Sequence, residues 1–258
     1  MFKNLLKEKI KAGKKTAGAW VQLASPFTAE IFSSAGFDWL MLDMEHAPGD
    51  ILTLVSQVHA MKGTDTVPLV RTPWNDFVAI KKILDAGAQG VLIPYVNNKE
   101  EAELAVKTCK YPTEGIRGVA GSPRAAGYGM NIGNYLQRAN EEIFIMIAVE
   151  TPEAVKNLDE ILEVEGLDGI FIGPMDLASS MGYFGNPSEP KVQAAIKEIE
   201  GKVFASDKVL ATTTGTWEGA QTLYERGYDM LMLMADGINL AKMAKQKMTE
   251  FHEHYPNG

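Results

Sequence analysis

The chain has very little cysteine, no long apolar segment and no excess of basic residues. Its single cysteine, Cys109, cannot form an internal disulfide and favours a reducing compartment. No uninterrupted apolar run reaches the roughly 18 residues needed to cross a bilayer. The 33 acidic residues outnumber the 25 basic ones, and the net charge of −8 argues against a nucleic-acid or anionic-membrane partner. Residues 1–15 mix lysines with apolar positions, which predicts an amphipathic surface helix of a cytoplasmic protein rather than a signal peptide.

Two further absences concern chemistry. No predicted strand carries a lysine in its interior, which argues against a Schiff-base mechanism. No group of cysteines and histidines has the spacing of a zinc site. Asp236 follows the last predicted strand and would repel a phosphate, so we expect an unphosphorylated substrate, although residues 212–215 still offer hydrogen-bond donors there.

Short apolar runs alternate with helical patterns along the whole chain. The runs are near-continuously apolar, as expected for strands covered on both faces. Eight such units in 258 residues predict one closed (β/α)8 barrel domain, residues 1–258, with an extra N-terminal helix. A doubly wound open sheet is the alternative, but no GxGxxG motif begins the first helix. A Gly-rich stretch, residues 111–140, interrupts the alternation of strand and helix patterns and is long enough to be a functional or disordered loop. The predicted strands are residues 16–23, 39–44, 67–72, 90–96, 143–150, 168–173, 208–213 and 230–234.

Polar residues follow several of these strands, at the end where barrels of this type carry their chemistry. Glu150 and Asp176 end two consecutive strands, and paired carboxylates are suited to Mg²⁺ or Mn²⁺. The alternative is that both are solvated acids at the starts of loops. Asp176 also follows Gly173-Pro174 at a predicted helix start, whose amides would hold a substrate carboxylate unless the residue is an ordinary helix cap.

His46 and Arg71 are the other candidates at this rim. His46 is the one histidine at a strand end, where a neutral imidazole would accept a proton, with Asp43 or Asp85 to orient it. Arg71 ends an otherwise apolar strand and would stabilise an oxyanion, while also pairing with Glu45 or Asp43. A base, an oxyanion stabiliser and a hard metal that chelates a 2-keto acid predict enolate chemistry, best matched by metal-assisted aldol cleavage or condensation.

These segments resemble the HpcH/HpaI aldolase family of class II pyruvate aldolases. The resemblance lies in FDWLMLDMEHAPGD (37–50), VPLVRTPWND (67–76), EGIRGVAGSPRA (114–125), VETPEAVKN (149–157) and LDGIFIGPMDLASSMGYFGNP (167–187). It implies a (β/α)8 barrel, assembled as a homohexamer, that reversibly cleaves a 4-hydroxy-2-oxo acid to pyruvate and an aldehyde through a metal-bound pyruvate enolate.

The resemblance also assigns roles to individual residues. It implies that His46 accepts the proton, that Asp85 raises its basicity and that Arg71 stabilises the transition state. Glu150 and Asp176 would bind the metal, Mg²⁺ or Mn²⁺ with Co²⁺ as a further option. The substrate would contact Arg71 and the segment Gly173, Pro174, Met175 and Asp176, with the Met175 backbone at its carboxylate.

Two positions depart from the family, and other readings stay open. Ala148 stands where many members carry a glutamine that holds pyruvate, and Met44 stands where many carry a small residue. An oxaloacetate-type decarboxylase and a non-catalytic acid-binding barrel are therefore alternatives. In the last predicted helix, residues 238–251, a stripe of Leu240, Met243, Ala244 and Met248 is typical of ordinary core packing, so the hexamer comes from the resemblance alone.

Overall fold

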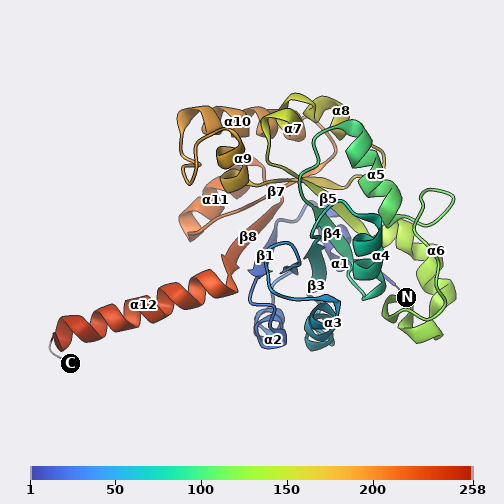
Figure 1. Ribbon diagram of the computed structural model, residues 1–258, viewed down its shortest axis with the longest axis horizontal. Coiled ribbons are helices and arrows are strands. Elements are labelled where there is room, and N and C mark those ends of the chain that lie inside the picture. Colours follow the sequence, from blue (N-terminus) through green and yellow to red (C-terminus); the bar gives the residue numbers. More distant parts are fainter. Residues whose placement is uncertain (1, 257–258) are drawn as a thin grey trace.

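The strands form one closed barrel in a computed structural model that describes residues 2–256. All eight strands are parallel, and each is hydrogen-bonded to its neighbours in chain order, with β8 closing on β1 (Figure 1). This confirms the predicted (β/α)8 architecture and excludes the open sheet. The strands are β1 (Thr16–Val21), β2 (Trp39–Asp43), β3 (Val67–Arg71), β4 (Gly90–Ile93), β5 (Phe144–Val149), β6 (Gly169–Ile172), β7 (Val209–Thr213) and β8 (Met230–Ala235).

The apolar strand sequences supply two separate cores. Successive strand residues point alternately into the barrel and outward against the helices. Trp39, Met41 and Phe144 belong to the core inside the barrel and are almost completely buried. Polar caps begin most helices just after the strands, as where the Asp76 side chain accepts a hydrogen bond from the amide of Ala79 at 2.8 Å. The helices over the barrel are α2 (Pro26–Ser34), α3 (Ile51–Ala60), α4 (Phe77–Asp85), α5 (Lys99–Cys109), α7 (Pro152–Lys156), α8 (Leu158–Leu162), α9 (Pro174–Ser180), α10 (Pro190–Phe204) and α11 (Trp217–Arg226).

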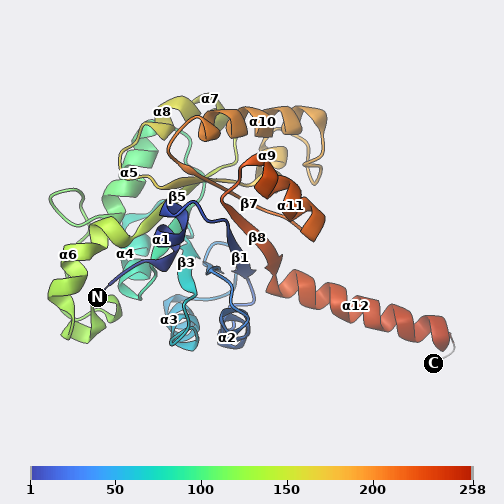
Figure 2. The same cartoon turned by 180° about the vertical axis from the view of Figure 1, so that it is seen from behind.

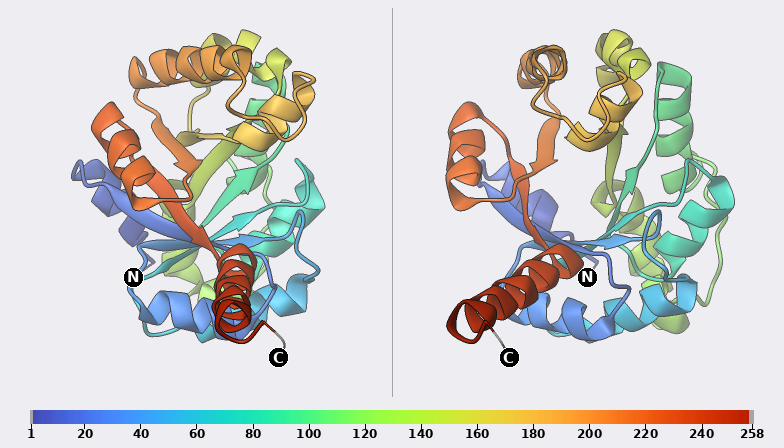
Figure 3. Two further views of the ribbon diagram at one scale, coloured as in Figure 1. Left: turned by 90° about the vertical axis from the view of Figure 1, so that its left-hand side faces the viewer. Right: turned by 60° about the vertical axis from the view of Figure 1, so that its left-hand side comes forward.

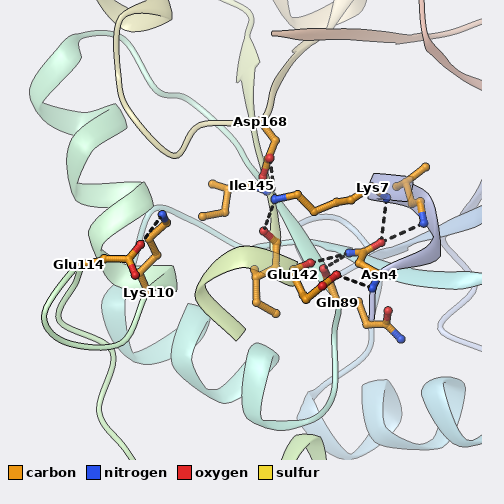
Figure 4. A network of polar contacts seen from close by, with 10 residues as sticks. Asn4, Lys7, Gln89, Lys110, Glu114, Glu142, Ile145 and Asp168 are labelled. Atoms are coloured by element: carbon orange, nitrogen blue, oxygen red, sulfur yellow. Dashed lines mark hydrogen bonds and ion pairs between the residues drawn. The ribbon is translucent and has the colours of Figure 1, made fainter. Parts of the chain in front are cut away.

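The N-terminal helix α1 (Leu5–Lys11) covers the end of the barrel where the strands begin (Figure 2). Asn4 is fully buried, and its amide group donates hydrogen bonds of 2.8 Å to the carbonyls of Gln89 and Glu142. Lys7 pairs with Asp168 at 2.7 Å (Figure 4). The predicted surface helix is thus shorter than residues 1–15 and partly buried, and Met1 lies outside the described residues.

The long interruption between β4 and β5 contains more structure than a loop. A 3-10 segment, η1 (Arg124–Gly129), and an amphipathic helix, α6 (Ile132–Glu142), follow α5. The prediction of a loop through residue 140 was therefore wrong at its C-terminal part, because Tyr135 and Ala139 pack at helical spacing into the core.

The last helix, α12 (Asp236–His254), leaves the barrel and projects away from it (Figures 1 and 3). Its Leu240, Met243 and Met248 are more than half exposed. The expectation that this stripe packs into the core of the barrel was therefore wrong, because within a single chain these side chains face solvent. Within residues 2–256, no helix is both long and apolar enough to cross a membrane.

Candidate active site at the carboxyl ends of the strands

A cavity of about 410 Å³ lies at the carboxyl ends of the strands. Its aromatic walls include Trp20 and Phe171, whose rings meet edge to face at 6.1 Å. The first turns of α12 close one side, so the projecting helix begins as part of the site. The polar and charged residues that line the cavity are Gln22, His46, Arg71, Asp176, Thr213, Thr214, Asn239 and Lys242.

Arg71 is held rigidly between two carboxylates. Its Nε and Nη2 donate to Oδ1 and Oδ2 of Asp43 at 2.9 and 2.5 Å, and its Nη1 lies 3.1 Å from Oε2 of Glu45. The guanidinium carbon also lies 4.4 Å from the centre of the Trp20 ring. Burial alone would raise the pKa of Asp43, but the hydrogen bonds and charge of Arg71 outweigh it and hold that pKa below its ordinary value. Two guanidinium N–H groups are hydrogen-bonded to Asp43 and Nη1 forms an ion pair with Glu45, and Arg71 also lines the cavity, where its remaining N–H groups can meet a ligand.

His46 stands at the edge of the same cavity. Its side chain is 64% exposed, and its Nε2 lies 3.8 Å from Oε2 of Glu45. Asp43 positions the loop, because its Oδ1 accepts hydrogen bonds from the backbone amides of Glu45 and His46 at 3.0 and 3.3 Å. The imidazole is therefore open to a substrate in the cavity, beside the guanidinium of Arg71.

Glu150 is a buried carboxylate next to the cavity. Its Oε1 accepts a 2.8 Å hydrogen bond from the backbone amide of Tyr95, and its carbonyl accepts one of 2.7 Å from the hydroxyl of Ser180. Burial raises the pKa of Glu150 to about 7, against the opposing amide of Tyr95, and the negative charges of Asp176 and Glu45 add to the rise. A cation at this carboxylate would relieve both the burial and the repulsion.

Gly173 lets two carboxylates converge on one space. A Cβ added to Gly173 would lie 2.9 Å from Oε2 of Glu150 and 3.8 Å from Oδ2 of Asp176. Any other residue at position 173 would therefore place its Cβ against the Glu150 oxygen and near the Asp176 oxygen. Two carboxylates facing one small space, with the third acid Glu45 nearby, form a donor set of hard oxygens that fits Mg²⁺ or Mn²⁺.

The protein supplies few ligands to such a cation. Among residues 2–256, no group of three or more His, Cys, Asp or Glu side chains is arranged as a metal site. Mg²⁺ usually keeps several waters and takes one or two carboxylates from the protein. A pair of carboxylates would therefore leave positions for water and for substrate oxygens.

Asp85 does not share this site within the chain. It ends α4, on the side of the barrel where strands begin, and its Oδ1 pairs with Nη2 of the buried Arg117 at 2.7 Å. The other predicted residues, His46, Arg71 and Asp176, all line the cavity, and Ala148 is buried inside the barrel.

The sequence predicted only a pairing role for Glu45, and it predicted no role for Tyr95 or for the first turns of α12 that line the cavity. Glu45 is a partly buried acid between Arg71 and His46, and its position in the DMEH segment was the available signal. Burial raises the pKa of Glu45, and the positive charge of Arg71 opposes the rise. Tyr95 acts through its backbone amide, and side-chain patterns carry no signal for such a contact.

Comparisons with known proteins agree with this geometry. A family model described as HpcH/HpaI aldolase/citrate lyase matches residues 16–242. A 4-hydroxy-2-oxo-heptane-1,7-dioate aldolase from Escherichia coli is 41% identical over 250 residues, which cover 97% of this chain and 95% of that protein.

Two solved structures are similar over almost their full lengths. An HpcH/HpaI aldolase/citrate lyase family protein from Burkholderia cenocepacia J2315 has a TM-score of 0.92 and 32% identity, over 96% of this chain and 99% of that one. An HpcH/HpaI aldolase from Desulfitobacterium hafniense DCB-2 has a TM-score of 0.89 and 32% identity, over 96% of both chains. The similarity thus includes the whole barrel and the rim that carries the cavity.

Proposed function

The chain belongs to the HpcH/HpaI aldolase/citrate lyase family and is an aldolase, and from this premise we propose that it cleaves a 4-hydroxy-2-oxo acid to pyruvate and an aldehyde. The observation that carries the proposal is that a fixed guanidinium, an open imidazole and two converging carboxylates share one rim. Membership in an aldolase family argues against the non-catalytic alternative. The unphosphorylated substrate expected from Asp236 also stays part of the proposal.

Glu150 and Asp176 would hold a divalent cation, Mg²⁺ or Mn²⁺. When bound, the cation acts as a Lewis acid that polarises the 2-keto group of the substrate. The two carboxylates supply negative charge to retain it, and the amide of Tyr95 keeps one oxygen of Glu150 occupied so that the other faces Asp176. The cation's charge would keep Glu150 ionised near neutral pH despite its raised pKa.

His46 and Arg71 carry the bond-breaking step. His46 accepts the proton of the 4-hydroxyl group, the C3–C4 bond breaks, and its electron pair forms the enolate of pyruvate as the aldehyde departs. The N–H groups of Arg71 that are not hydrogen-bonded to Asp43 stabilise the negative oxygen that develops. The enolate then takes a proton at C3 to give pyruvate. The start of α9 would bind the carboxylate of the 2-oxo acid through the backbone amides of Met175 and Asp176, since Pro174 has no N–H.

We place this enzyme in the cytoplasm as a homo-oligomer, and the hexamer implied by the resemblance is the assembly proposed. The projecting α12 carries exposed apolar residues that a second copy would cover. Assembly also bears on Asp85, because within one chain Asp85 lies at the opposite end of the barrel from His46. Its predicted action on the histidine therefore requires Asp85 from another copy.

The test follows pyruvate release from a 4-hydroxy-2-oxo acid by mass spectrometry, with Mg²⁺ or Mn²⁺ and then with excess chelator. We expect cleavage that stops in chelator and that a Glu150→Ala, Asp176→Ala double variant has lost. A matched double variant of the exposed acids Asp65 and Glu225 to Ala should keep full activity. Oxaloacetate is assayed in parallel, and faster decarboxylation than aldol cleavage would favour the decarboxylase instead. Full activity of the double site variant would defeat the proposal.

A further inference from the structure

Two exposed aromatic rings stack on the rim beside the carboxylates. Trp74 follows β3 and Tyr95 follows β4, and their ring centroids lie 5.5 Å apart with planes inclined by 26°. Trp74 is 54% exposed and Tyr95 is 38% exposed. Neither ring lines the cavity, so substrate binding as described above does not account for the pair.

Tyr95 has an unusual backbone conformation. Its φ is +52°, in the left-handed region that bulky residues rarely adopt. Such a conformation persists only when its surroundings enforce it. Here it turns the Tyr95 amide toward Glu150, with an N–H to Oε1 hydrogen bond of 2.8 Å. The strained backbone thus has a direct consequence for the candidate metal ligand.

The loops that carry the two rings are tied down from several sides. The side-chain amide of Asn97 donates to the Tyr95 carbonyl at 3.1 Å, and the backbone carbonyl of Asn97 accepts from the side-chain amide of Asn157 at 2.8 Å. On the other loop, the hydroxyl of Thr72 donates to the Trp74 carbonyl at 3.0 Å. These bonds hold both backbones, and the stacked rings join the two loops directly.

A shared residue on α5 links the loops a second time. Glu101 accepts a 2.7 Å hydrogen bond from the Asn97 amide through its side chain and a 3.0 Å bond from the Asn75 side chain through its carbonyl. The backbone that carries Trp74 is therefore tied to the backbone that carries Tyr95, and the Trp74 ring packs on the Tyr95 ring from that position. Loss of the Trp74 ring would remove the stacking contact of the Tyr95 ring, which opposes rotation of Tyr95 toward ordinary backbone angles together with the hydrogen bonds to its amide and carbonyl.

We propose that Trp74 and Tyr95 form an aromatic clamp that positions Glu150 for the divalent cation. The stack holds Tyr95 in its left-handed conformation, the Tyr95 amide binds Oε1 of Glu150, and Oε2 is left facing the space beside Gly173 and Asp176. Both residues are positioning residues, because neither ring lines the cavity where the substrate would bind. The inference rests on the proposed metal-dependent function.

The experiment measures Mn²⁺ binding to the metal-free protein by isothermal titration calorimetry. We expect Trp74→Ala to weaken binding by about 10-fold or more, as is usual when a partner of a metal ligand is lost. Trp74→Phe, which can still stack, should restore most of the affinity. Tyr95→Phe should bind Mn²⁺ like the wild type, because the ring and the amide both remain. Trp217→Ala, at an equally exposed tryptophan outside the site, is the control.

A second pair of variants tests the backbone directly. Tyr95→Gly and Tyr95→Val both lack the ring, but glycine adopts a positive φ freely and a β-branched residue resists it. We expect Mn²⁺ affinity to fall further for Tyr95→Val than for Tyr95→Gly. Thermal melts of the metal-free variants show whether each is folded.

The outcomes separate this inference from the proposed function. Wild-type protein that binds no Mn²⁺ overturns both. Wild-type binding that Glu150→Gln abolishes, together with unchanged affinity in a folded Trp74→Ala variant, overturns the clamp alone. Equal affinities of the Gly and Val variants also overturn it, as does a Trp74→Ala variant changed only in its KM for the substrate.

Discussion

At the scale of single residues, the lack of a side chain at Gly173 leaves space for the carboxylates of Glu150 and Asp176. Gly173 has an ordinary negative φ of −92°, so its backbone does not require glycine. The reason for glycine is spatial, since a Cβ would come within 2.9 Å of Oε2 of Glu150. A contact that short forces the carboxylate to move, and the carboxylate is the candidate metal ligand.

Gly173→Ala should therefore weaken Mn²⁺ binding by about 10- to 100-fold, because the carboxylate of Glu150 is displaced from the space that it shares with Asp176. Calorimetric titration of the metal-free protein measures the change. Gly201→Ala is the matched control, since a Cβ there meets nothing within 4 Å. Wild-type affinity in Gly173→Ala would show that the cation does not bind between these two carboxylates.

Glu150 also predicts a pH dependence of stability. Its pKa rises from 4.5 to about 7 on folding, so the folded state holds the extra proton between these values. The free energy of unfolding of the metal-free protein therefore loses its Glu150 contribution as pH rises through this window. Glu150→Gln should stabilise the protein by about 3 kcal/mol above pH 7 and hardly at all near pH 4.5.

Urea unfolding in chelator, at both ends of that pH window, measures the difference between Glu150→Gln and wild type. Groups that do not interact with Glu150 contribute equally to both proteins and cancel in the comparison, and the coupling of Glu150 to Asp176 and Glu45 is part of the difference that is measured. Saturating Mn²⁺ should reverse the order, because only the wild type retains the full ligand pair. A stability difference that does not change with pH would mean that Glu150 is not a strained carboxylate.

At the scale of elements, α1 acts as a plug for the barrel. The Oδ1 of Asn4 accepts from the amides of Leu6 and Lys7 at 3.0 and 3.3 Å, while its Nδ2 donates to two carbonyls beneath the strands (Figure 4). One buried side chain thus both starts the helix and docks it. The opposite end of the barrel, with the cavity, is left free for chemistry.

Asn4→Ala should lower the free energy of unfolding by about 2–4 kcal/mol, because it removes a helix cap and leaves buried polar groups without partners. The rate of the enzyme should change little at a temperature where the variant is folded, since Asn4 lies at the other end of the barrel. Urea unfolding and a pyruvate assay give the two readouts. Lys3→Ala, at an exposed ion pair of the same segment, should leave both unchanged.

At the scale of the whole molecule, α12 does not fit a solitary barrel. Its first turns line the cavity through Ile238, Asn239 and Lys242, and the rest extends outward with an apolar stripe exposed (Figure 3). One end of α12 lines the cavity, and the other end exposes apolar residues that another copy of the chain would bury. Assembly of the oligomer would therefore affect the shape of the active site.

Glu substitutions at both Leu240 and Met243 should therefore reduce the size of the protein in solution, because charges would replace the apolar contacts on α12. Light scattering after size exclusion should give a wild-type mass several times the 28.2 kDa of the chain and a smaller mass for the variant. Lys245→Glu, on the same helix, is the charge control. A monomeric wild type would contradict the proposed homo-oligomer.

The sequence by itself determined the barrel and most of its rim. Continuous apolar runs predicted eight strands covered on both faces, and the polar residues that end those strands named His46, Arg71, Glu150 and Asp176, because parallel strands bring their carboxyl ends to one edge. Both predictions depend only on local residue patterns and on the order of the strands along the chain, which the sequence contains.

Only the tertiary structure decided the rest. The separation of Asp85 from His46, the Tyr95 amide on Glu150 and the exposure of the α12 stripe all depend on where backbone atoms lie in space. An apolar stripe at helical spacing has the same sequence whether it packs on its own barrel or on another copy. Every residue except proline has a backbone N–H, so the sequence does not show which amide binds a given carboxylate. The contact of the Tyr95 amide with Glu150, 55 residues away, could therefore be found only in the folded chain.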